Sequence, residues 1–98
     1  MINRIVRLSF KPESVDEFLL LFEAVKIEIA NFEGCKGLTL LQDANALNVF
    51  YTYSIWTDLD ALERYRQSAL FSETWVKTKL LFNDKPVAYS TTINQLVK

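Results

Sequence analysis

The chain has 98 residues, 50% of them hydrophobic, and we expect one domain spanning residues 1–98. The 11 Lys and Arg residues nearly balance the 12 Asp and Glu residues, so the net charge is −1. The composition therefore indicates no basic surface that would bind nucleic acid or an anionic membrane. The sequence has no run of about 18 apolar residues, the length needed to span a membrane. It also has no histidine, which excludes imidazole as a metal ligand, a general base or an axial haem ligand.

The first predicted elements are a strand and a helix. Polar and apolar residues alternate from Met1 to Phe10, which predicts a strand. This start lacks the apolar block of a signal peptide, so we expect a cytoplasmic protein. Ser14 and Glu17 have the spacing of a capping box, and apolar residues then recur every three or four positions. A helix is therefore predicted from Ser14 to about Asn31.

Both glycines and the only cysteine lie at the end of this helix. Gly34 is expected to adopt positive φ as the helix C-cap, and Gly37 lets the chain turn into a strand predicted over residues 38–41. Cys35 is expected to be a small, buried and unreactive apolar side chain. A single thiol forms no internal disulfide, which fits a reducing cytoplasm.

The second half of the chain predicts a strand, two helices and a last strand. Their expected spans are Val49–Trp56, a helix from a cap at Thr57 or Asp58 to about Gln67, a helix from Ser68 to about Phe82, and Val87–Leu96. The order is then β-α-β-β-α-α-β. This order predicts an α+β ferredoxin-like sandwich with an antiparallel sheet.

The strand over Val49–Trp56 carries large side chains on both faces. Tyr51, Tyr53 and Ile55 alternate with Phe50 and Trp56. Helices cover only one face of a four-stranded sheet, so aromatic residues on the second face imply a covering partner. The simplest partner is a second copy, and we therefore predict a homodimer.

The residues offer few catalytic groups. Asp58, Asp60, Glu63 and Glu73 fit helix capping and solvation better than a metal site. No glycine-rich phosphate loop, zinc-ligand spacing or RNA-binding aromatic signature is present. An aromatic set remains: Tyr51, Tyr53, Trp56, Tyr65, Phe71, Trp75 and Phe82. Most members are expected in the core, but the polar groups of Tyr65 and Trp75 need partners, and a cavity between helices and sheet would suit a flat aromatic ligand.

The segments FEGCKGL, IWTDLDALERYRQSALF, WVKTKLLF and KPVAYS resemble the antibiotic biosynthesis monooxygenase family over nearly the whole chain. The resemblance implies a dimeric α+β barrel that uses molecular oxygen on a small aromatic, phenolic or quinol substrate, with no metal, flavin or other cofactor. In that chemistry the substrate itself, as an electron-rich phenolate, reduces oxygen. The residues assigned to the site are Tyr65 and Arg66 as catalytic groups, and Trp75, Tyr51, Tyr53, Trp56 and Phe71 as substrate-binding groups.

The chain departs from the family at three positions. Tyr65 stands where many members carry histidine and the haem-degrading branch carries tryptophan, and Trp75 stands at that branch's iron-binding histidine. The asparagine of that branch falls near Ile5, so haem degradation is not expected. Tyr65 is expected to hydrogen-bond the phenolic oxygen, Arg66 to favour the phenolate and Trp75 to stack on the ring. The alternative is a non-catalytic dimeric barrel that binds a small molecule or has another role.

Overall fold

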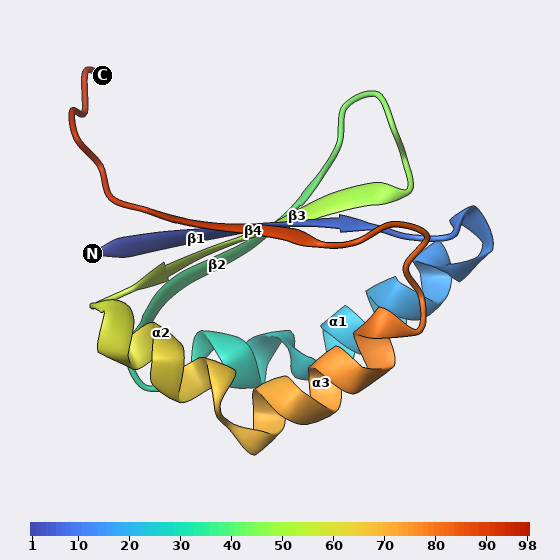
Figure 1. Ribbon diagram of the computed structural model, residues 1–98, viewed down its shortest axis with the longest axis horizontal. Helices are drawn as coiled ribbons and strands as arrows, with labels where there is room; N and C mark the ends of the chain where they lie inside the picture. The colour runs from blue at the N-terminus through green and yellow to red at the C-terminus, as the bar shows by residue number, and fades with distance from the viewer.

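The computed structural model describes all 98 residues, and helices pack on one face of a four-stranded antiparallel sheet (Figure 1). The elements are β1 (Ile2–Ser9), the 3-10 turn η1 (Pro12–Ser14), α1 (Val15–Ala30), β2 (Cys35–Gln42), β3 (Val49–Trp56), α2 (Leu59–Arg66), α3 (Ala69–Lys79) and β4 (Val87–Thr91). The predicted element order and the α+β ferredoxin-like fold are confirmed. None of the helices has both the length and the apolar character needed to cross a membrane.

The sheet has the strand order β2-β3-β1-β4. The central strand β1 pairs along its whole length with β3, from Ile2 opposite Trp56 to Ser9 opposite Val49. Its other side pairs with the edge strand β4 only from Asn3 to Arg7. All three helices lie on the same side of the sheet in Figure 1, so one face is covered and the other is open.

Two buried clusters hold the helices on the sheet. One contains Leu8, Phe10, Phe18, Phe50 and Leu81, and the other contains Trp56, Ala61 and Leu62. Phe10 and Trp56 are the largest side chains with no exposed surface, one in each cluster. Aromatic side chains thus anchor both ends of the covered face, and the space between the clusters is less completely filled.

The predicted cap of α2 is confirmed, and Ser68, where the next helix was expected to begin, caps α3. The Asp58 carboxylate accepts a hydrogen bond from the amide of Ala61 at 2.8 Å, and the Ser68 hydroxyl accepts one from the amide of Phe71 at 3.1 Å. Ser14 precedes α1 but its side chain makes no capping bond, so the predicted capping box is wrong. The 3-10 turn that begins at Pro12 holds Ser14 in a helical backbone conformation, whereas a capping residue is normally extended.

The last strand is shorter than the sequence predicts. It ends at Thr91 instead of Leu96, because Thr91 pairs with Asn3 and β1 has almost no residues beyond that point to continue the ladder. The segment after Thr91 leaves the sheet (Figure 1). Helix α3 likewise ends at Lys79, before Phe82, and β2 begins at Cys35, before residue 38.

Gly34 has φ +88°, which confirms the predicted positive φ, but it is not the helix cap. Helix α1 ends with Asn31 in a right-handed conformation, and Gly34 lies in the following turn into β2. A Cβ atom on Gly34 would lie 2.5 Å from the Cβ of Ala61, so close packing against α2 also requires glycine. Cys35 is half-buried rather than buried, and its Sγ lies 3.5 Å from the carbonyl oxygen of Gly37.

Candidate functional site

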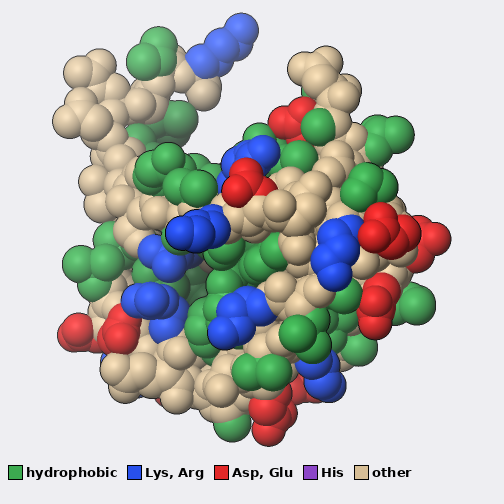
Figure 2. Space-filling model, turned by 45° about the vertical axis from the view of Figure 1, so that its right-hand side comes forward, with side chains coloured by type: hydrophobic (Ala, Val, Ile, Leu, Met, Phe, Trp, Pro, Cys, Tyr) green, Lys and Arg blue, Asp and Glu red, His purple; other side chains and the backbone are tan.

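A cavity of about 320 Å³ lies between the covered face of the sheet and the helices. All four strands and all three helices contribute to its lining, which is mostly hydrophobic. Figure 2 shows a hollow with hydrophobic side chains at its floor and Lys and Arg side chains around it. The volume is at the lower end of the range for small-molecule sites.

The sheet wall follows from strand alternation. Side chains of successive strand residues point to opposite faces, so Thr52, Ser54 and Trp56 line the cavity while Tyr51 and Tyr53 face away from it. The structure therefore corrects the sequence-based grouping, since Tyr51 and Tyr53 do not lie with the other predicted substrate-binding residues.

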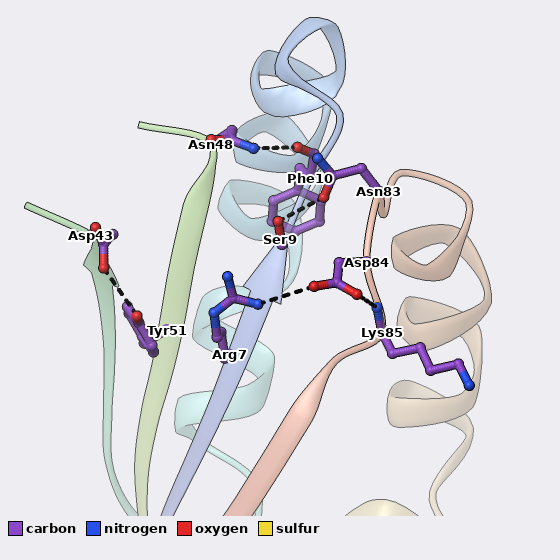
Figure 3. A network of polar contacts seen from close by, with 9 residues as sticks. All are labelled: Arg7, Ser9, Phe10, Asp43, Asn48, Tyr51, Asn83, Asp84 and Lys85. Carbon is purple, nitrogen blue, oxygen red and sulfur yellow. Dashed lines mark hydrogen bonds and ion pairs between the residues drawn. The ribbon is translucent and has the colours of Figure 1, made fainter. Parts of the chain in front are cut away.

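On the open face both tyrosines have partners. The Tyr51 hydroxyl donates to Asp43 Oδ1 at 3.0 Å (Figure 3). The Tyr53 hydroxyl donates to Asn3 Oδ1 at 3.4 Å. These two side chains therefore belong to the open surface of the sheet and not to the cavity.

The other five predicted site residues line the cavity: Trp56, Tyr65, Arg66, Phe71 and Trp75. Their aromatic rings form one continuous series. Tyr65 stacks on Trp56 at a centroid distance of 4.9 Å, Phe71 meets the edge of Tyr65 at 5.3 Å, and Trp75 stacks on Phe71 at 5.7 Å. The break between α2 and α3 at Gln67 and Ser68 lets both helices contribute rings to this wall.

Trp56 bounds the cavity but has 0% exposed surface. Its indole Nε1 donates to the Ser54 hydroxyl at 2.9 Å, which fixes the ring in the core. A side chain without exposed surface cannot contact a ligand in the cavity as it stands. Trp56 therefore supports Tyr65 from behind, which differs from the direct substrate contact expected from the sequence.

The Tyr65 hydroxyl has no hydrogen-bond partner in the protein. No polar side-chain atom of the molecule is both fully buried and unpaired, so this hydroxyl keeps some accessible surface, and the Tyr65 side chain lines the cavity. Burial, with a smaller contribution from Cys35, raises the pKa of Tyr65 to about 12. At neutral pH this side chain is a hydrogen-bond donor and not a base.

Two arginines line the cavity from opposite walls. Arg66, on α2, donates to Glu63 Oε2 at 3.1 Å, and its side chain is 45% exposed. Arg4, on β1, donates to the Ser90 hydroxyl at 3.0 Å and has no acidic partner. Burial lowers the pKa of Arg4, the Arg66 charge lowers it further, and Glu63 opposes the shift.

Sequence reasoning missed Arg4, although the signal was present. Arg4 shares its strand face with Val6 and Leu8, which both line the cavity. A charge on the apolar face of a strand is unusual and marks a position where a ligand or a buried partner needs it. No Asp or Glu lines the cavity, and no three His, Cys, Asp or Glu side chains lie close enough together to hold a metal ion.

The sequence profile of the antibiotic biosynthesis monooxygenase family matches residues 1–75. This chain belongs to that family. The match includes all five of the predicted residues that line the cavity, and the predicted resemblance is confirmed. None of the curated protein sequences matches the chain.

Several solved structures have the same fold as this chain. A structure described as an antibiotic biosynthesis monooxygenase is 18% identical, covers 97% of this chain and 100% of its own, and superposes with a TM-score of 0.91. SnoaB, a cofactor-independent oxygenase from Streptomyces nogalater, is 21% identical over 98% of this chain and 95% of its own, with a TM-score of 0.86. A conserved protein from Methanosarcina mazei is also 21% identical, over 92% and 89% of the two chains, with a TM-score of 0.88.

Proposed function

We propose that this family member is a monooxygenase that uses molecular oxygen on a small aromatic, phenolic or quinol substrate without a cofactor. The observation that carries the proposal is a cavity walled by aromatic rings and lined by Tyr65, whose hydroxyl has no partner in the protein. The similarity in fold to SnoaB, a cofactor-independent oxygenase, supports it.

The cavity residues have distinct roles in this proposal. Trp75, next to Phe71, stacks on the substrate ring. The Tyr65 hydroxyl, neutral because its pKa is about 12, donates a hydrogen bond to the phenolic oxygen. The guanidinium group of Arg66 favours the ionised form of that oxygen.

The reaction balances without a further reductant. The phenolate gives an electron to oxygen, and the resulting radical pair joins through a new carbon–oxygen bond to form a peroxide. The O–O bond then breaks, the ring carbon loses its hydrogen as a proton, and the second oxygen atom leaves as water. A phenol and O₂ thus give a quinone and water, and the electrons come from the substrate.

We also propose that residues 1–98 form one cytoplasmic domain that acts as a homodimer through the open face of the sheet. This face presents Ile5, Tyr53 and Ile55, which are half-buried, and Tyr89, which is 59% exposed. The segment after β4 adds exposed Ile93, Leu96 and Val97. A stable dimer should bury more than about 1,200 Å² in total, and sedimentation that shows only monomer at micromolar concentration would contradict it.

The second candidate is a non-catalytic barrel that binds a small molecule. The lining favours it in one respect, because no histidine, Asp or Glu accepts a proton there and Tyr65 is too weak an acid to supply a tyrosinate base. Oxygen uptake with a panel of phenols and quinols separates the two candidates. The enzyme should accelerate uptake above autoxidation, whereas binding without uptake for every compound would favour the non-catalytic barrel.

A further inference from the structure

We propose that Arg4 forms an anion-binding subsite in the cavity, and that the ligand is an aromatic molecule that binds with a negatively charged oxygen, as a carboxylate or an ionised phenol. The inference rests on the proposed function only in taking the cavity as the site of a small aromatic ligand. It does not require that oxygen reacts there.

The first observation is that Arg4 is a half-buried cation that forms no salt bridge, although the charge of Glu63 acts on it from a distance. The ion pairs of the molecule are Arg7–Asp84, Lys26–Glu23 and Arg66–Glu63, and none involves Arg4. Of the five N–H donors of its guanidinium group, Arg4 uses one in its hydrogen bond to Ser90. The charge has lost part of its hydration, and an anion with two oxygens would compensate for that loss.

The second observation concerns the surroundings of Arg4. Across the sheet it is the direct partner of Ser54 on β3 and Ser90 on β4, so hydroxyl groups flank it on the cavity face. Apolar Val6 and Ala88 follow along the same wall, and no carboxylate lines the cavity to compete for the arginine. An aromatic body would rest on the apolar wall with its charged oxygen at Arg4.

The third observation separates the two arginines. Arg66 already forms a salt bridge with Glu63, and its side chain is 45% exposed. Solvent and the Glu63 carboxylate therefore both weaken its electrostatic attraction for a ligand. Arg4 lies on the opposite wall without an acidic partner. Arg66 thus adds to the positive potential of the cavity, whereas Arg4 makes the direct contact.

The absence of a base in the cavity agrees with this assignment. Tyr65 is a neutral donor, and the lining offers no other group that accepts a proton at neutral pH. A ligand that is already ionised needs no such base. The structure therefore favours acidic substrates, such as aromatic carboxylic acids and phenols with low pKa, over neutral ones.

The test is calorimetric titration of the full chain with pairs of ligands that share a shape and differ in charge. Naphthoate and naphthamide form one pair, and nitrophenol and nitroanisole form the other, at a pH at which the phenol is ionised. In each pair the anion should bind about tenfold or more tightly. The two pairs distinguish a carboxylate from a phenolate as the preferred anion.

Three variants locate the effect. Arg4→Gln should abolish the preference for the anion, and Arg4→Lys, which keeps the charge but not the planar fork, should retain part of it. Arg7→Gln is the matched control, because Arg7 lies on the same strand, faces the open side and pairs with Asp84, so the preference should be unchanged. Circular dichroism checks the fold of each variant.

The outcomes are distinguishable from failure of the proposed function. Equal or tighter binding of the neutral ligands by the wild-type chain would overturn the subsite and leave the oxygenase proposal standing. A preference that survives Arg4→Gln would also overturn it, and so would a failure of all four ligands to bind. Preferential binding of anions without any oxygen uptake would support the subsite and contradict the oxygenase.

Discussion

The open side of the sheet and the side covered by helices present the same kinds of polar side chains with different partners. On the open face Arg7 pairs with Asp84 at 3.7 Å, and the Tyr51 hydroxyl donates to Asp43 at 3.0 Å (Figure 3). On the covered face Arg4 has no acidic partner and the Tyr65 hydroxyl has no partner at all. The covered face is the less hydrated of the two, so unpaired groups cost more there.

This difference indicates where a ligand acts. A side chain that is fully partnered within the protein gains little from a ligand, whereas an unpaired donor in a cavity gains a hydrogen bond that water supplies poorly. The covered side thus offers unpaired polar groups that a ligand can engage, whereas the polar groups of Arg7 and Tyr51 on the open face are already partnered.

The largest expected effect is on turnover. Tyr65→Phe removes the donor to the phenolic oxygen and should lower the rate of oxygen uptake about 10²-fold with the best substrate found. The matched control is Tyr89→Phe, which loses a hydroxyl on the open side of β4 and should keep the wild-type rate. Equal rates for all three chains would remove Tyr65 from the mechanism.

The next effect is on stability and compares the two glycines. Gly34→Ala should lower the free energy of unfolding by about 2–3 kcal/mol, because its φ is +88° and the new Cβ would overlap the Cβ of Ala61 on α2. Gly37→Ala should cost less than about 1 kcal/mol, since its Cβ would meet only the Ile55 side chain on the open face, most closely the flexible Cδ1 at 3.3 Å. Urea denaturation measures both, and a reversed order would contradict the packing described here.

A smaller effect concerns stability at alkaline pH. The folded-state pKa of Tyr65 is raised to about 12, so its contribution is fully present below the unfolded pKa of about 10 and is lost as pH rises towards 12. Between these values the wild-type chain should lose stability faster than Tyr65→Phe, by up to about 1 kcal/mol per pH unit. Parallel pH dependence of the two chains in chemical denaturation would show that the hydroxyl is hydrated.

The smallest effect is on the open face. Hydrogen bonds from the Asn45 amide, the Tyr51 hydroxyl and the Ala46 amide lower the pKa of Asp43. A carboxyl group whose pKa is lower in the folded state stabilises the fold at pH above its unfolded-state pKa. This contribution to the free energy of unfolding is lost as the pH falls through the folded-state pKa. Asp43→Asn should therefore be slightly less stable than wild type at neutral pH, with the difference vanishing in acid, as thermal melts at several pH values can measure.

Local signals in the sequence predicted most of the fold. Asp58 caps α2 as predicted, and Ser68 caps α3 at the position where that helix was expected to begin, because a cap depends only on residues three positions away. The cap at Ser14 failed because Pro12 begins a 3-10 turn, which the spacing did not indicate. The end of β4 depends on where β1 begins, because Thr91 pairs with Asn3 and almost no β1 residues precede it. This pairing joins residues far apart in the sequence.

The site was predictable only in part, for a similar reason. Alternation along β3 separates Tyr51 and Tyr53 from Trp56, but the sequence does not say which face the helices cover. Arg4 could be placed beside Val6 from the same alternation. Its significance depends on Ser90, 86 residues away in the chain, and on the absence of any carboxylate from the cavity.

The most direct test of the central claim is an NMR titration of the ¹⁵N-labelled chain with naphthoate, which reports the two faces at once. We expect shifts at Arg4, Tyr65 and the free Trp75 indole N–H, with little change at the Trp56 indole, which already donates a hydrogen bond to Ser54. Residues of the open face, such as Arg7 and Tyr89, should not shift. Shifts confined to the open face would contradict the assignment of the cavity as the site.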